Sequence, residues 1–354
     1  MPIRTYMVVD GRRDHGFRVP EPRLTAELGI PNACNDCHGD RDPAWAQAAL
    51  DSWGVSTDLR ATHAPLLAAG WSGRPDAAPA LLGLAADPAR PALLRASAAL
   101  AGGAFPAAET LQGLAPLLDS DDALVRAAAA RSLDWLPVEQ RYALLKRLVG
   151  DPSRSVRLAT ARQLAGVEGA GLPPNEAQAA AQALAALRQE YLESLRHDAD
   201  LPEGQMNLGL YHAAGGDPVA AEQAYRSALK LSPSFVPALL NLADLYRANG
   251  LDQQAEPQLQ QAIDRAPAAA APQHAMGLLL VRRGELDAAL GHLERAAALE
   301  PDNARYAYVY GVGLWEAGRR EAAIATLEAA LAAHPGDRDL QAALASYRQQ
   351  PQRP

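Results

Sequence analysis

Two cysteines and one histidine form the stretch with the clearest chemical potential. Cys34 and Cys37 are the only cysteines among the 354 residues, and His38 follows the second directly. This C-x-x-C-H spacing is the one that attaches a c-type haem, through two thioethers to the porphyrin and one imidazole to the iron. The stretch therefore predicts one covalently bound haem c, held by Cys34 and Cys37, with His38 as the proximal iron ligand.

Three other interpretations of the same stretch stay open. A thioredoxin-like redox pair would leave the histidine unexplained and lacks a surrounding βαβ pattern. Structural zinc needs four ligands, and the spacing of His15 and His63 is not that of a zinc finger. The third interpretation is a coincidence of residue types.

A helix is predicted to start directly after this stretch, at Asp42-Pro43. Trp45, Ala49 and Trp53 would share one face of this helix, either as core or as a wall for a porphyrin.

The bulk composition narrows the classes of protein. The formal charge is −8, hydrophobic residues make up 49% and aromatic residues only 5%. Abundant alanine suits closely packed helices, and the mild acidity argues against nucleic acid as a partner. The chain lacks an apolar run of 18 or more residues, so we expect no membrane span. The first 17 residues do not resemble a signal peptide, which conflicts with haem attachment outside the cytoplasm.

A period of 31 residues organises the chain from about residue 60 to 168. Leu94-Arg95, Val125-Arg126 and Val156-Arg157 lie one step apart, each followed by a helix of small residues. An Asp-containing turn precedes each pair. Paired helices at a fixed period are typical of an α-solenoid, and these segments resemble HEAT repeats.

A period of 34 residues governs the second half of the chain. Glycines, prolines, alanines and large apolar residues all recur at this step, and the turn glycines are Gly216, Gly250, Gly284 and Gly318. Small residues where two helices cross, a turn glycine and a closing proline resemble the tetratricopeptide repeat. Four repeats cover residues 202–337, and residues 338–348 would form a capping helix.

The N-terminal segment adds a further resemblance. The residues RTYMVVDGRRDHGFRVPEPRLTAELGIPNACNDCHGDRDPAWAQAALDSW, followed by two kinds of helical repeat, look like the C-terminal part of a multihaem cytochrome c family with tetratricopeptide repeats. The resemblance implies that Met1-Pro2 would follow an upstream haem motif. The signal peptide and further haems would then be lost with an upstream portion.

The same resemblances imply further site residues. Paired histidine ligands in the cytochrome family make His15 and His63 candidates for the distal iron ligand. In tetratricopeptide repeats, one face of each first helix lines a groove that binds a protein or peptide. That face is predicted to be mostly apolar and to favour a hydrophobic peptide or helix, or else to pack against the chain's own helices. Its residues are Met206, Leu210, Leu240, Leu278, Val281, Tyr308, Val312 and Trp315.

These observations predict an all-α protein with an irregular haem-binding segment followed by an α-solenoid. The predicted parts are residues 1–59 for the haem, 60–168 for HEAT-like repeats, 169–201 for a linker and half-repeat helix, and 202–354 for the tetratricopeptide repeats with their cap. The predicted function is extracytoplasmic electron transfer, to a redox protein or an upstream haem domain, with repeats that dock partners. The alternatives are a non-redox interaction scaffold, or a fragment of a multihaem enzyme acting on small nitrogen or sulfur compounds.

Overall fold

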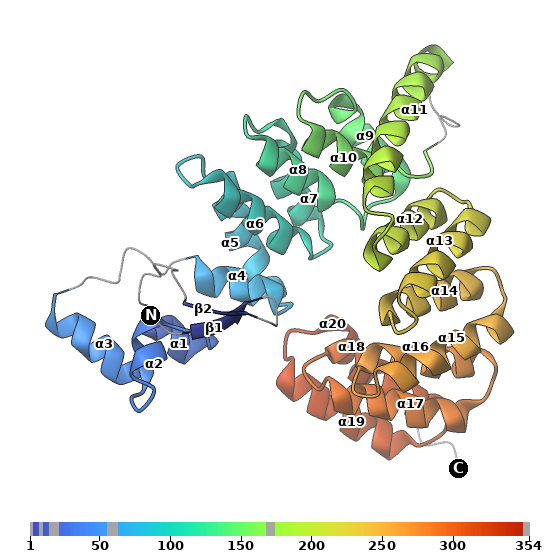
Figure 1. Cartoon of the computed structure of the whole chain (residues 1–354). Coiled ribbons are helices and arrows are strands. Elements are labelled where there is room, and N and C mark those ends of the chain that lie inside the picture. Colours follow the sequence, from blue (N-terminus) through green and yellow to red (C-terminus); the bar gives the residue numbers. More distant parts are fainter. Residues whose placement is uncertain (1–2, 7–9, 14–20, 55–62, 168–173, 350–354) are drawn as a thin grey trace. The chain divides into compact units, whose positions relative to one another are not determined.

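The computed structural model describes residues 3–6, 10–13, 21–54, 63–167 and 174–349, and within them the chain is helical apart from one short strand pair (Figure 1). The strands β1 (Ile3–Tyr6) and β2 (Asp10–Arg13) are antiparallel, with Ile3 opposite Arg13. The predicted helical fold class is thus confirmed for the described residues. Two compact units divide the chain, Met1–Leu187 and Arg188–Pro354, and each is described by itself.

Three helices occupy the segment that was predicted to be largely irregular. They are α1 (Pro22–Leu28), α2 (Ala33–Cys37) and α3 (Pro43–Ser52). The predicted start of α3 is confirmed, since the Asp42 carboxylate caps it by accepting a hydrogen bond from the Trp45 backbone N–H at 2.7 Å. The helices α1 and α2 were missed because seven and five residues are too few to show a helical period.

Seven further helices of the first unit form the HEAT-like array. They are α4 (Ala64–Trp71), α5 (Ala78–Ala86), α6 (Ala92–Gly103), α7 (Ala108–Leu114), α8 (Ala123–Arg131), α9 (Val138–Leu145) and α10 (Arg154–Gln163), with the 3₁₀ turns η1 (Pro75–Ala77), η2 (Ala115–Asp119) and η3 (Lys146–Leu148). The helices α6, α8 and α10 pack on one another in sequence. Ala98, Ala129 and Thr160 stand one 31-residue step apart, and all three are fully buried. Their small side chains allow the close approach of neighbouring helices.

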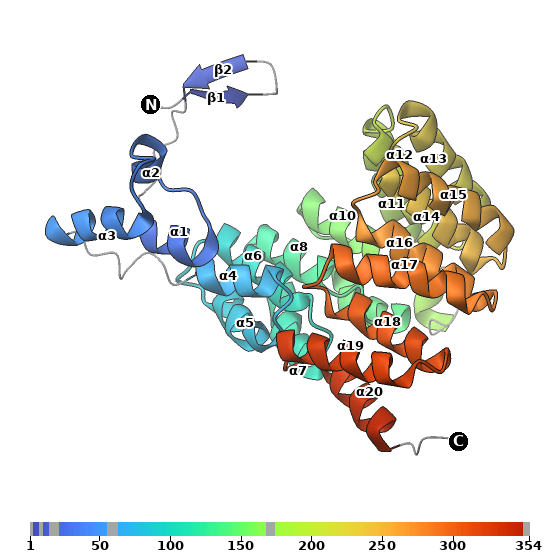
Figure 2. The same cartoon turned by 90° about the horizontal axis from the view of Figure 1, so that it is seen from below.

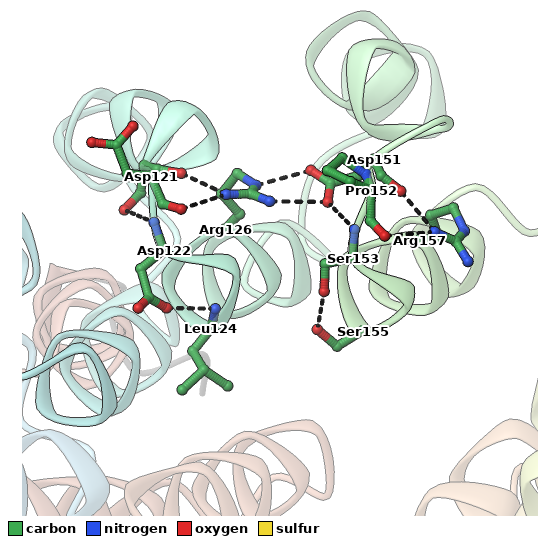
Figure 3. A network of polar contacts seen from close by, with 10 residues as sticks. Asp121, Asp122, Leu124, Arg126, Asp151, Pro152, Ser153, Ser155 and Arg157 are labelled. Atoms are coloured by element: carbon green, nitrogen blue, oxygen red, sulfur yellow. Dashed lines mark hydrogen bonds and ion pairs between the residues drawn. The ribbon is translucent and has the colours of Figure 1, made fainter.

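An ion pair joins two successive repeats of this array (Figure 3). Arg126 donates from Nε and Nη2 to the two carboxylate oxygens of Asp151, each at 2.9 Å. Its Nη1 also donates to the Ser120 carbonyl at 2.8 Å, so the side chain clamps the preceding turn. Asp151 in turn accepts from the Ser153 backbone N–H at 2.8 Å. Arg157 repeats the contact to a turn, since its Nη1 donates to the Asp151 carbonyl at 2.8 Å, whereas Arg95 donates to the Ala85 carbonyl inside α5.

The long helix α11 (Pro174–His197) is shared between the two units. Leu184 belongs to the hydrophobic core of the first unit. Within the second unit, the Tyr191 ring lies 5.0 Å from the Tyr211 ring, measured between centroids. Packing of Leu184 and of Tyr191 thus supports the middle and the second half of this helix.

In the described part of the second unit, nine helices follow α11. Figure 2 shows the same helices from another side. They are α12 (Pro202–Ala214), α13 (Pro218–Leu231), α14 (Val236–Ala248), α15 (Asp252–Arg265), α16 (Ala270–Arg282), α17 (Leu286–Leu299), α18 (Ala304–Glu316), α19 (Arg320–Ala333) and α20 (Arg338–Gln349). The four turn glycines adopt φ between 73° and 77°, which explains why glycine recurs there. The repeating unit is therefore two antiparallel helices joined by a left-handed glycine turn.

The two helices of a repeat approach closely at one recurring position. A Cβ atom on Gly209 would lie 2.4 Å from the Tyr225 ring, and one on Gly277 would lie 2.6 Å from Leu293. The second repeat has Ala243 at this position, 34 residues after Gly209, and it is buried against the core. Small residues here let Tyr225 and the leucines of the second helices fill the space between helices.

The described residues include no helix that is both long enough and apolar enough to cross a lipid bilayer.

Candidate functional site

Cys34, Cys37 and His38 lie in and just after the single turn of α2. The Asn32 side chain caps this turn, because its Oδ1 accepts hydrogen bonds from the backbone N–H groups of Cys34 and Asn35 at 3.0 and 3.1 Å. The His38 backbone N–H donates to the Cys34 carbonyl at 2.9 Å and closes the turn. Both cysteines are free thiols, Cys34 half-buried and Cys37 exposed. The turn is thus held by its own backbone hydrogen bonds.

Aromatic side chains surround this turn differently from the prediction. The His38 ring lies 4.9 Å from the Trp45 ring, and the Arg41 guanidinium lies 5.9 Å from the centre of the same ring. The helix α3 buries Ala46 and Leu50, whereas Trp53 is 72% exposed. Trp45 and Trp53 are therefore not the core face of α3, which instead buries Ala46 and Leu50.

Of the two candidate distal ligands, only His63 lies within the described residues. His15 lies outside the described residues. His63 is half-buried and begins α4, where it makes no side-chain capping bond. Within the described ranges, no group of three or more His, Cys, Asp or Glu side chains could hold a metal ion.

The face predicted to bind a partner lies on the first helix of each repeat, and we call it the first-helix face. It consists of four positions on each of α12, α14, α16 and α18. Of the eight predicted residues, Leu210 and Val281 are exposed, and the others are half-buried. Those others are Met206, Leu240, Leu278, Tyr308, Val312 and Trp315.

The capping helix covers part of this face at the fourth repeat. The rings of Trp315 and Tyr347 stack with their centroids 4.0 Å apart and their planes 4° apart. Tyr308 packs with the same cluster, in which Leu340 and Leu344 of α20 are buried. Tyr308 and Trp315 thus pack against the capping helix α20. The open part of the first-helix face lies in the earlier repeats.

Two pockets open on the middle of the first-helix face. One has a volume of about 240 Å³ and is lined by α14, α15 and α16, with Leu240, His274 and Leu278 among its residues. The other has a volume of about 490 Å³ and lies between α12, α13 and α14, with Leu210 and Leu245 in its lining. The face is therefore hollowed on both sides of α14.

Charged residues that the sequence reasoning missed line these pockets. Asp244 and Arg247 border both pockets, and Arg282 borders the smaller one. The 34-residue step could have found the first two, since Asp244 lies 34 residues after Leu210 and Arg247 lies 34 residues before Val281. Asp244 and Arg247 are charged at positions where other repeats carry apolar residues, so a purely apolar pattern does not include them.

Burial shifts the pKa of two side chains at the pockets. Burial, with a smaller effect of the nearby Asp244 charge, raises the pKa of Tyr225 to about 12. Burial, together with the positive charge of Arg305, lowers the pKa of His274 below its ordinary value. Both side chains are therefore neutral at pH 7.

Comparisons with protein families identify both repeat classes. Tetratricopeptide repeat profiles match residues 175–235, 274–338 and 212–279, and a HEAT repeat profile matches residues 89–165. The chain thus contains HEAT repeats followed by tetratricopeptide repeats, which confirms this part of the prediction. A comparison with curated protein sequences gave no match.

Solved structures that match parts of the chain include two that are described as tetratricopeptide repeat proteins. The chain is 25% identical to the MamA protein, over 43% of this chain and 82% of that one, with a TM-score of 0.38. A thermophilic tetratricopeptide repeat protein of Thermus thermophilus is 24% identical, over 53% of this chain and all of that one, with a TM-score of 0.39. YrrB, described as having an unusual peptide-binding site, is 19% identical over 58% and 98% of the two chains, with a TM-score of 0.36. At these TM-scores the likenesses carry no functional argument.

These findings correct the cytochrome prediction. The matched families are repeat families, and no comparison shows a multihaem cytochrome c or a redox partner. In the described part of the chain, Cys34, Cys37 and His38 do not gather into a group of metal-binding side chains with any histidine or carboxylate. The predictions of a haem c cofactor and of electron transfer are therefore wrong. The physical reason is that a short motif fixes the types of ligand but not whether a pocket surrounds them.

Proposed function

We propose that this chain is a protein-interaction scaffold that binds a segment of a partner protein on its first-helix face. Tetratricopeptide repeats form extended surfaces for binding proteins and peptides, and the family profiles cover most of the second unit. The observation that carries the proposal is the pair of pockets on either side of α14. The HEAT-like repeats belong to the same class of stacked helical scaffold.

The exposure of apolar side chains supports this assignment. Leu210 is 39% exposed and Val281 is 41% exposed, and both lie on the face that holds the pockets. When a partner covers exposed apolar side chains, the free energy of binding becomes more favourable by about 25 cal/mol per Å² of apolar surface removed from water. A partner segment that fills the larger pocket would cover Leu210, which lines it.

Site-specific photo-cross-linking in the native cell tests the proposal. A benzophenone amino acid replaces Leu278 at the smaller pocket or, as the matched control, Leu231, which is 50% exposed at the end of α13. We expect a discrete cross-linked protein from position 278 that is absent from position 231. Leu240→Glu should abolish this cross-link, whereas Cys34→Ala/Cys37→Ala should not change it. Equal cross-linking from both positions would contradict the proposal.

An extracytoplasmic location, predicted from the Cys34–His38 stretch, stays a prediction. Fractionation of native cells with an antibody against the chain measures it, since the expected result is recovery outside the cytoplasmic fraction.

A further inference from the structure

The two pockets of the first-helix face are neighbours, and the residues that line both of them form a ridge between them. Asp244 and Arg247 are the two charged residues common to both linings, and both stand on α14. Beside the ridge, the larger pocket presents Leu210 and Leu245, and the smaller one presents Leu240 and Leu278. A single partner segment that enters one pocket must cross this ridge to reach the other.

The charges around the pockets are neutralised within the protein itself. Arg247 donates from Nε to Oδ1 of Asp244 at 2.8 Å, so the ridge is an ion pair. Arg282 at the smaller pocket donates from Nη2 to Oδ1 of Asp252 at 2.9 Å. The remaining titratable group of that pocket, His274, is neutral at pH 7 because burial and Arg305 lower its pKa. The charges within each pair balance, so these linings offer a charged group of a partner no net opposite charge.

We infer that the occupant of this face is an uncharged peptide segment that places one apolar side chain in each pocket and crosses the Asp244–Arg247 ridge between them. The inference rests on the proposed function and adds the chemistry of the partner. Apolar anchors match the leucines and alanines that each lining contains, and a segment without charge leaves both ion pairs intact. An acidic peptide, which would need cations without partners, is the competing occupant.

Fluorescence anisotropy with the full chain and synthetic probes tests this inference. The first probes are labelled 15-residue peptides with capped ends, in which two leucines are separated by one to six serines or glutamines. The second are the same peptides with both leucines replaced by glutamate. We expect at least one peptide of the leucine series to bind, with a Kd that changes less than twofold between 50 and 500 mM NaCl. Binding of the glutamate series alone, or no binding in the leucine series, would overturn the inference.

Variants separate this inference from the proposed function. Leu240→Glu should weaken the leucine peptide at least tenfold, while the exposed control Leu231→Glu should change its Kd less than twofold. Asp244→Ala removes the partner of Arg247, so it should create measurable binding of the glutamate series. If glutamate peptides bind the wild type and lose affinity in Leu240→Glu, the face binds peptides but the uncharged chemistry is wrong. If leucine peptides bind equally to wild type and Leu240→Glu, the proposed function itself fails.

Discussion

At the residue scale, the ion pair of Arg126 and Asp151 shows how one side chain supports a whole repeat. The pair is nearly closed off from solvent, with 13% and 6% of the two side chains exposed. Removing one partner of a buried pair leaves the other charge uncompensated, which costs much more than losing an exposed pair. The arginine period of the sequence therefore marks stability and not a binding site.

We expect Asp151→Ala to lower the free energy of unfolding of the first unit by about 3–5 kcal/mol, because Arg126 would be buried without its counter-ion. The matched control is Asp87→Ala. The Asp87 and Arg90 side chains of this ion pair are 40% and 47% exposed, so its loss should change the free energy of unfolding little. Urea denaturation followed by circular dichroism measures both. Equal losses in the two variants would show that burial of the pair is not what matters.

The Arg126–Asp151 pair also makes the free energy of unfolding depend on pH in the acidic range. Burial alone would raise the pKa of Asp151, but the hydrogen bonds from Arg126 and from the Ser153 backbone N–H outweigh it, so the pKa is lowered. The folded state then binds the proton less readily than the unfolded state. The contribution is present above the ordinary aspartate pKa near 3.9 and is lost as pH falls below it.

His274 gives the second unit a pH dependence in the neutral range. Its pKa is lowered by burial and by Arg305, so the unfolded chain takes up the proton first as pH falls. We expect the free energy of unfolding to decrease below about pH 6.5, and His274→Phe to flatten this decrease while keeping the ring contact with Tyr306. Urea titrations of both proteins at several pH values check this. An unchanged slope in the variant would contradict the assignment to His274.

At the element scale, the close crossing of paired helices decides at which positions a small residue is needed for stability. Gly277 and Gly291 both lie inside helices, α16 and α17, yet their surroundings are opposite. A Cβ on Gly277 would lie 2.6 Å from Leu293, whereas one on Gly291 would meet no atom within 4 Å. The same substitution should therefore have opposite signs at the two positions.

We expect Gly277→Ala to destabilise the second unit by about 1–3 kcal/mol through overpacking. Gly291→Ala should stabilise it by about 0.5–1 kcal/mol, because alanine has the higher helix propensity. Thermal and urea unfolding of the two variants measure the difference. A loss of stability in both would mean that helix crossing is not the cause.

The sequence predicted the repeat helices well and the short ones poorly, for a physical reason. Periods of 31 and 34 residues repeat a packing constraint several times, so Gly216 and its equivalents identify each turn without any knowledge of the structure. The helices α1 and α2 have no repeat to reveal them. The buried stripe of α3 was also misjudged, because Ala46 and Leu50 compete with Trp45 and Trp53, and only the neighbouring helices decide between them.

The candidate site was predictable in position but not in detail. The 34-residue step located the first-helix face, and Leu240 and Leu278 do line a pocket. The Trp315–Tyr347 stack depends on where α20 docks, and the Asp244–Arg247 pair depends on side-chain positions, so neither followed from the pattern. For Cys34 to His38, the residue types were right for haem, but the spacing could not say whether other side chains gather around them.

At the scale of the whole molecule, the two units have separate hydrophobic cores. The first core centres on leucines and alanines between α5 and α10, and the second unit has its own clusters from α13 onward. Separate cores favour unfolding in two steps.

We therefore expect differential scanning calorimetry to resolve two transitions. Asp151→Ala should shift one of them and Gly277→Ala the other, because Asp151 pairs with Arg126 in the first unit and Gly277 packs against Leu293 in the second. A single transition that moves as a whole in both variants would show that the units unfold together.

The central claim is that the chain binds a partner segment on the first-helix face, independently of its cysteines. Isothermal titration calorimetry with the partner identified by cross-linking at position 278 tests this directly. We predict that Leu240→Glu weakens binding at least tenfold, or by about 1.4 kcal/mol, and that Leu231→Glu and Cys34→Ala/Cys37→Ala bind as tightly as the wild type. Loss of binding in the cysteine variant, with wild-type affinity in Leu240→Glu, would contradict the account.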